Sequence, residues 1–234
     1  MKYYSVSNSA EKEIGRTYPQ LHCTTQIHAH ALSSWEFPNF TPRLIFDLEK
    51  SAKLTDVLST GSISADGFLV NSKVRDILGD FNLMKHQYYM ASVSLPKTGE
   101  TLPYYWLHFS QPELTKQINY ENSTFYETEW TFRENLIKIN SYEHYQELKS
   151  YDKKAKFGVN IDEIAVTEKF DKDLDVFIFL PFSKLYISAR LKNALEENKV
   201  IGLVYEEAPE VKFLKKQPLT HVAVAQPLQK SNIL

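Results

Sequence analysis

Two histidines are spaced as metal ligands on an extended chain would be. His28 and His30 are one residue apart, so a strand would place both imidazoles on the same face. His22 and Cys23 lie just upstream, and the four side chains together resemble part of a zinc site. A zinc site usually needs three or four protein ligands, yet the sequence has no CxxC, HExxH or second histidine pair. We therefore interpret residues 26–31 as a short surface strand and expect no bound metal.

A run of aromatic residues, YYWLHF at positions 104–109, is the kind of surface on which a base or a sugar could stack. Basic side chains should then interleave with the rings, but none lies between Lys97 and Lys116. His108 and Glu113 could act as an acid/base pair, although nothing in the sequence places a nucleophile beside them. A half-buried strand of a hairpin explains the run better.

An acidic and aromatic segment, YENSTFYETEW at positions 120–130, points to protein binding. Tyrosine and tryptophan are frequent at interface hot spots, and carboxylates speed association with a basic partner. The candidate partner-binding residues are Tyr120, Glu121, Tyr126, Glu127, Glu129 and Trp130. The alternative is an ordinary amphipathic strand in which Phe125, Tyr126 and Trp130 are partly buried.

Composition narrows the class of protein. The chain has 234 residues, of which 43% are hydrophobic, and this allows a sizeable core without disulfides or metals. A formal net charge of -2 gives no basic field for nucleic acid, and a single cysteine excludes an intrachain disulfide, as in a reducing compartment. The N-terminus lacks the apolar core of a secretory signal, and no stretch approaches the ~20 apolar residues of a membrane span. These features predict a cytoplasmic protein without nucleic-acid or membrane partners.

Catalytic motifs are absent from the sequence. There are only seven glycines, which argues against loops that cradle phosphates. The sequence also lacks metal-binding motifs and a nucleophile elbow. We therefore expect a protein that is not an enzyme, with no catalytic residues and no cofactor. The alternative is a small-ligand-binding protein or hydrolase that uses the aromatic segment 104–130 with His108 or His144.

Strand and helix patterns are mixed along the chain, which favours an α+β fold. We expect a mixed or antiparallel sheet with helices packed on it, in a single domain of residues 1–234. The charge-rich stretch 149–175 is the best candidate for a subdivision, and the run from Asp162 to Asp175 is typical of a solvated face. Strands are expected at 2–7, 43–48, 68–70, 88–95, 104–109, 136–139, 157–161, 164–166, 177–180, 184–187 and 203–206, a turn or short helix at 54–58, and a helix at 141–151.

Two segments share one pattern: FLVNSKVRDIL at 68–78 and LYISARLKNAL at 185–195. Each is an apolar run, a capping residue and an amphipathic helix, with Asn71 and Ser188 as the N-caps. The spacing predicts two buried helix faces, formed by Val74, Ile77 and Leu78 and by Leu191, Ala194 and Leu195. The fold should therefore contain two similar strand–cap–helix units.

These two copies and their surroundings carry a resemblance to a known family. The matching pieces are 54–57 leading to 67–72, and 187–192 leading to 201–203. They resemble a bacterial family of uncharacterised proteins grouped with the immunity proteins of polymorphic toxin systems, namely immunity family eleven, with the related family forty-three. That family favours a serine at the helix start, which Ser188 matches and Asn71 does not.

The resemblance covers roughly residues 40–110 and 175–206. It implies that the chain binds a cognate protein toxin and neutralises the toxin by occlusion. It implies no catalytic residues and no cofactor.

Overall fold

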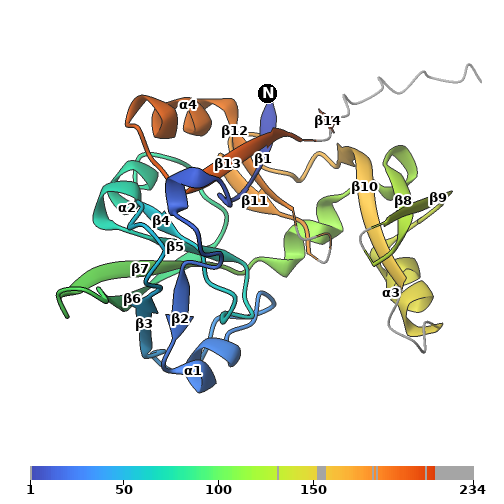
Figure 1. The fold of residues 1–234 in the computed structure, drawn as a ribbon. Coiled ribbons are helices and arrows are strands. Elements are labelled where there is room, and N and C mark those ends of the chain that lie inside the picture. Colours follow the sequence, from blue (N-terminus) through green and yellow to red (C-terminus); the bar gives the residue numbers. More distant parts are fainter. Residues whose placement is uncertain are drawn as a thin grey trace, which may run out of the picture.

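The computed structural model describes residues 2–130, 132–151, 157–180, 182, 184–208 and 210–213. The fold belongs to the α+β class, with 40% of residues in strands and 21% in helices, so sheets rather than helices form the framework. In the described part of the chain the strands form three sheets (Figure 1).

The largest sheet has six strands and is mixed, because β3 runs parallel to β6 while the other pairs are antiparallel. Its order is β2 (Leu21–Cys23), β3 (Leu44–Leu48), β6 (His86–Ser94), β7 (Thr101–Phe109), β5 (Gly67–Val70) and β4 (Val57–Leu58). The predicted hairpin between the strands near 88–95 and 104–109 is confirmed, because Tyr88 pairs with Leu107 and Ser94 with Thr101.

A second, antiparallel sheet joins the two ends of the chain. Its order is β11 (Val176–Ile178), β12 (Leu185–Ser188), β1 (Tyr3–Asn8) and β13 (Leu203–Glu207). The first strand of the protein therefore lies between two strands from its last fifty residues. Helix α4 (Ala189–Glu197) connects β12 to β13 across β1, just as α2 (Ser72–Leu78) connects β5 to β6 across β7.

The third sheet consists of β14 (Glu210–Phe213), β10 (Phe157–Val166), β8 (Thr124–Glu129) and β9 (Phe132–Ile137), in that order. Figure 1 shows its β8–β9 hairpin at the side of the molecule, beside helix α3 (Tyr142–Tyr151). Short 3-10 turns link this region to the six-stranded sheet: η2 (Pro112–Gln117) and η3 (Tyr120–Asn122). Another 3-10 turn, η1 (Lys12–Ile14), follows β1.

Both predicted helix caps are present. The Asn71 side chain accepts a hydrogen bond from the Val74 N–H at 3.1 Å, and the Ser188 hydroxyl accepts one from the Leu191 N–H at 3.1 Å. Of the side chains predicted to be buried, Val74, Leu78, Leu191 and Leu195 lie in one core cluster. Ile77 and Ala194 are only half-buried, which corrects the prediction, because each lies at the margin of its helix face.

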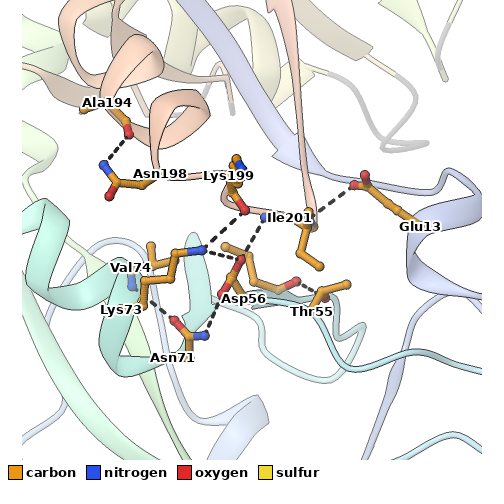
Figure 2. Close-up of polar contacts among 12 residues, drawn as sticks. Glu13, Thr55, Asp56, Asn71, Lys73, Val74, Ala194, Asn198, Lys199 and Ile201 are labelled. Atoms are coloured by element: carbon orange, nitrogen blue, oxygen red, sulfur yellow. Dashed lines mark hydrogen bonds and ion pairs between the residues drawn. The ribbon is translucent and has the colours of Figure 1, made fainter.

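One aspartate precedes each strand–cap–helix segment and holds it in place. The Asp56 carboxylate accepts hydrogen bonds from the Asn71 amide at 2.8 Å and from the Ile201 N–H at 3.0 Å, and forms an ion pair with Lys73 at 3.2 Å (Figure 2). Asp56 thereby joins the start of α2 to the chain that leaves α4.

Asp175 makes the reciprocal connection. Its carboxylate accepts hydrogen bonds from the Ser188 hydroxyl at 2.5 Å and from the Asn82 N–H at 2.9 Å, and forms an ion pair with Arg190. It therefore joins the start of α4 to the chain that leaves α2. We refer to these two arrangements as the Asp56 clamp and the Asp175 clamp.

Two clusters of buried side chains fill the core, one on each face of the six-stranded sheet. Alternation along the strands separates them, because side chains of successive residues point to opposite faces. Val70 and Leu107 belong to the cluster that also contains the inward faces of α2 and α4. Leu69 and Trp106 belong to the other cluster.

Several local predictions were wrong. Residues 26–31 form a helix, α1 (Gln26–His30), rather than a strand. Residues 57–58 form the edge strand β4, because they pair with β5, where we expected a turn or helix. The two expected fragments at 157–161 and 164–166 are one strand with a register shift.

The run from Asp162 to Asp175 is a solvated face only in part, at Glu168, Lys169 and 171–173, which are exposed. It contributes buried apolar side chains from β10 and from the turn after it, and the Asp175 side chain is fully buried. A buried carboxylate requires charged or hydrogen-bonding partners, and the Asp175 clamp provides them. Part of the predicted boundary at 149–175 lies outside the described residues, as does the tail beyond Phe213.

Candidate protein-binding surface

The β8–β9 hairpin has a tight turn. Glu129 pairs with Phe132, so a loop of two residues connects the strands. Loops of this length require positive backbone φ angles and therefore favour asparagine and glycine. Trp130 occupies the first loop position with φ of 60°, although a large side chain in this conformation costs about 1 kcal/mol.

The Trp130 side chain is 76% exposed, so burial does not offset the cost of its backbone conformation. Tryptophan is rarely this exposed without a partner, since its large apolar surface is better removed from water. Strain at an exposed aromatic residue suggests a functional rather than a structural reason for the residue.

Strand β9 extends this apolar surface. Phe132 is 71% exposed and Leu136 is 65% exposed. Among the strands that the structure describes, β9 lies at the edge of its sheet and pairs only with β8. Edge strands usually carry charges or irregularities that prevent further pairing. β9 has a bulge opposite β8, but it also presents two large apolar side chains to solvent.

An ion pair fixes one face of the hairpin. The two terminal guanidinium nitrogens of Arg133 donate to the carboxylate of Asp162 on β10, at 2.7 and 2.6 Å. The same guanidinium lies over the Tyr126 ring, 4.3 Å from its centroid. These contacts hold β9 against β8 and β10 without covering Trp130.

An aromatic cluster anchors the hairpin to the body of the protein. Phe125 is buried and packs on Tyr120 and Phe182, and Phe182 also contacts Tyr145 of α3. Aromatic pairs of this kind contribute roughly 0.5–1.5 kcal/mol each beyond the burial of their area. The base of the hairpin is therefore held firmly while its tip remains exposed.

The structure places the six predicted partner-binding residues in different environments. Trp130 and Glu129 lie at the exposed tip, and Tyr126 and Glu127 are half-buried in β8. Glu121 is exposed on η3. Tyr120 is buried, and its hydroxyl donates to the Thr115 carbonyl at 3.1 Å, so this residue supports the hairpin from inside.

Sequence reasoning missed Phe132 and Leu136. Their signal was weak, because the segment FRENLI mixes apolar and charged residues and was expected to contribute a strand only from residue 136. The exposure of the two side chains depends on β9 being an edge strand, which a single sequence does not reveal.

The residues of the enzymatic alternative are engaged in the fold. His108 is buried, with Nε2 2.8 Å from the Ser33 carbonyl oxygen, and burial lowers its pKa below 6.5. Glu113, which the sequence offered as a possible acid/base partner of His108, is exposed on η2, whereas His108 is buried. His144 Nδ1 accepts a hydrogen bond from the Asn140 N–H at 3.3 Å at the start of α3.

The histidines considered as zinc ligands lie on a helix. Because α1 rotates each residue by about 100°, His28 and His30 point in different directions. His28 Nδ1 accepts a hydrogen bond from the Arg43 N–H at 3.2 Å, and Cys23 is buried. Within the residues that the structure describes, no group of three or more His, Cys, Asp or Glu side chains is arranged to hold a metal ion.

Three of the segments that carry the family resemblance, 54–57, 67–72 and 201–203, meet at the Asp56 clamp (Figure 2). Thr55 donates to the Val57 carbonyl at 2.6 Å, and the Val57 N–H donates to the Ile201 carbonyl at 3.1 Å. Gly202 lies against this strand so closely that an added Cβ would sit 2.1 Å from the Val57 oxygen. These residues join parts of the fold to one another.

No protein-family model and no curated protein matches this chain. Across the described ranges, none of the helices combines the length and the apolar character needed to cross a membrane.

Proposed function

We propose that this chain is an immunity protein that binds a co-encoded bacterial toxin through the β8–β9 hairpin and blocks it by occlusion. The observation that carries the proposal is the exposed Trp130 at a positive φ angle. A residue that costs conformational energy and gains no burial in the free protein fits a hot-spot anchor that enters a pocket of a partner.

The charge of the hairpin supports a basic partner. Strands β8 and β9 contain three glutamates, Glu127, Glu129 and Glu134, and one basic residue, Arg133. Arg133 is already paired with Asp162. The excess of carboxylates would speed association with a basic toxin, such as a nuclease, whereas the apolar side chains would slow dissociation.

We also propose that the two strand–cap–helix segments are copies of one unit and form the scaffold of a single domain. Each copy has an aspartate, a strand pair, a capping residue and a helix that crosses over an intervening strand. The β8–β9 hairpin lies between the two copies in the sequence and has no counterpart in either. Partner binding would then belong to this hairpin and stability to the copies.

Co-expression tests this function. The toxin gene next to this one is expressed in cells with wild-type protein, with Trp130→Asn, or with Trp35→Asn as a control at an exposed tryptophan away from the hairpin. We expect protection by the wild type and by Trp35→Asn, and loss of protection by Trp130→Asn.

Stability distinguishes this result from misfolding. Asparagine is favoured at a positive φ angle, so Trp130→Asn should melt at the temperature of the wild type or slightly above it. If the wild type gives no protection and forms no complex with the toxin, the immunity function is wrong.

One feature favours the alternative of a small-ligand-binding protein. A cleft of about 440 Å³ lies between η3 and the start of α3, with Lys116, Glu121 and Glu143 in its lining. Ser141, at its rim, accepts a hydrogen bond from the His144 N–H and so serves as the helix cap. A rise in melting temperature with a small zwitterionic ligand such as an amino acid, lost in Lys116→Ala, would support this alternative.

A further inference from the structure

The backbone of β9 has polar groups that face away from its own sheet. The residue pair next to a two-residue loop is hydrogen-bonded, and successive antiparallel pairs alternate between hydrogen-bonded and non-hydrogen-bonded. Glu129 and Phe132 are the loop-flanking pair, so Arg133 belongs to the next, non-hydrogen-bonded pair with Thr128. The N–H and C=O of Arg133 therefore point outward, away from β8.

We propose that the partner of this protein adds a strand to the free edge of β9, which extends the sheet β14-β10-β8-β9 across the interface. The inference rests on the proposed function and adds to it the mode of binding. Outward backbone groups would give the affinity, as in other cases of strand addition, and the side chains beside them would select the sequence.

The side chains of β9 specify the chemistry of the added strand. Glu134 would be matched by lysine or arginine on the neighbouring strand, because opposite charges across a strand pair are favourable. Phe132 and Leu136 would be matched by apolar residues, because both are largely exposed in the free protein. The predicted occupant is thus an edge strand of a basic protein, with apolar residues opposite Phe132 and Leu136 and a basic residue opposite Glu134.

A second copy of this chain fits the edge less well. The antiparallel register that places Phe132 of one copy opposite Leu136 of the other also places the two Glu134 side chains opposite each other. Like charges in directly opposed positions destabilise a strand pair. Charge complementarity therefore favours a basic partner over self-association.

Two substitutions at position 133 separate the contribution of the backbone to toxin binding from that of the side chain. Arg133→Ala removes the ion pair with Asp162 but keeps the outward N–H. Arg133→Pro removes both, and proline is tolerated on an edge strand where the N–H faces solvent. We expect Arg133→Pro to weaken binding to the co-encoded toxin about tenfold more than Arg133→Ala does.

Hydrogen exchange of the complex gives an independent measurement that needs no variant. The amide of Arg133 should exchange quickly in the free protein and become protected when the toxin is bound, whereas amides of β6 should not change.

A further pair of variants tests the side chains of the edge. Leu136→Lys should weaken toxin binding, because it adds a charge to the edge strand, and Met90→Lys, at a 71% exposed residue of β6, serves as its control.

The outcomes of these experiments distinguish the mode of binding from the proposed immunity function. Strand addition is wrong if the complex forms without protection of the β9 amides and if Arg133→Pro and Arg133→Ala weaken binding equally. Such a result would leave the immunity function unaffected. A dimer of the free protein that Leu136→Lys dissociates also overturns strand addition by the partner, because a second copy would then occupy the edge.

Discussion

The two aspartate clamps have the same connections in different environments. In each, the backbone N–H of the capping residue donates to the aspartate carbonyl, at 2.9 Å from Asn71 to Asp56 and at 2.8 Å from Ser188 to Asp175. In each, a basic residue two positions after the cap forms an ion pair with the carboxylate. The Asp56 side chain is 15% exposed, whereas that of Asp175 is 0% exposed.

The difference shows how burial selects the partners of a carboxylate. Asp175 is paired with arginine, whose fork of donors contacts both carboxylate oxygens, and with the hydroxyl of Ser188. Asp56, closer to water, is paired with lysine, a single charge that needs no fixed geometry. We therefore expect these connections to stabilise the start of α4 more than the start of α2.

Removal of each carboxylate is the strongest test of this difference. Asp175→Ala leaves the buried Ser188 hydroxyl without its acceptor and also removes the acceptor of the Asn82 N–H, which should cost about 2–4 kcal/mol of unfolding free energy. Asp56→Ala should cost less, about 1–2 kcal/mol, because water can reach the released donors. Urea unfolding of the two variants measures both values, and equal losses would contradict the comparison.

Acid unfolding should reveal the same asymmetry. Burial by itself would raise the pKa of Asp175, but hydrogen bonds from Arg190, Ser188 and the Asn82 N–H outweigh burial and hold the pKa below 3.8. The stabilisation is therefore present above pH 3.8 and is lost as the pH falls through the lower folded-state pKa. Stability measured from pH 5 downward should fall less steeply in Asp175→Asn than in the wild type. A parallel decline in the two proteins would mean that the carboxylate is not preferentially ionised in the folded state.

The smallest expected effect is at Lys73. Its side chain is 41% exposed, and surface ion pairs contribute little, so Lys73→Ala should change the unfolding free energy by about 0.5 kcal/mol or less. High salt should reduce even this difference, because screening weakens exposed pairs. A loss comparable to that of Asp56→Ala would show that lysine is essential to the clamp.

Patterns within one element were predicted well, and patterns that depend on distant partners were not. The caps at Asn71 and Ser188 and the hairpin of β6 and β7 follow from nearby residues, so sequence alone was sufficient. The helix at 26–30 was missed because five residues give too little periodicity. Asp175 was missed because a charge run normally indicates solvent, although its position directly before an apolar strand, like that of Asp56, was a usable signal.

For the candidate surface, the sequence identified the segment 120–130 but not which of its residues face outward. Tyr120 and Trp130 are both aromatic residues beside glutamates, yet one is buried and the other exposed. The two residues differ in exposure because Trp130 lies in the tight turn of the hairpin, away from the core.

The sequence by itself determined the α+β class, the two capped helices and the composition of the acidic aromatic segment, because these depend on local periodicity and side-chain chemistry. Only the tertiary structure decided that β1 lies between β12 and β13, that Asp56 and Asp175 each join one helix to the exit of the other, and that β9 is an edge. The place of β1 and the two aspartate links arise from contacts between residues more than ninety positions apart, and the edge position of β9 depends on which other described strands pair with its sheet. All three are set by the packing of the whole chain rather than by any local pattern.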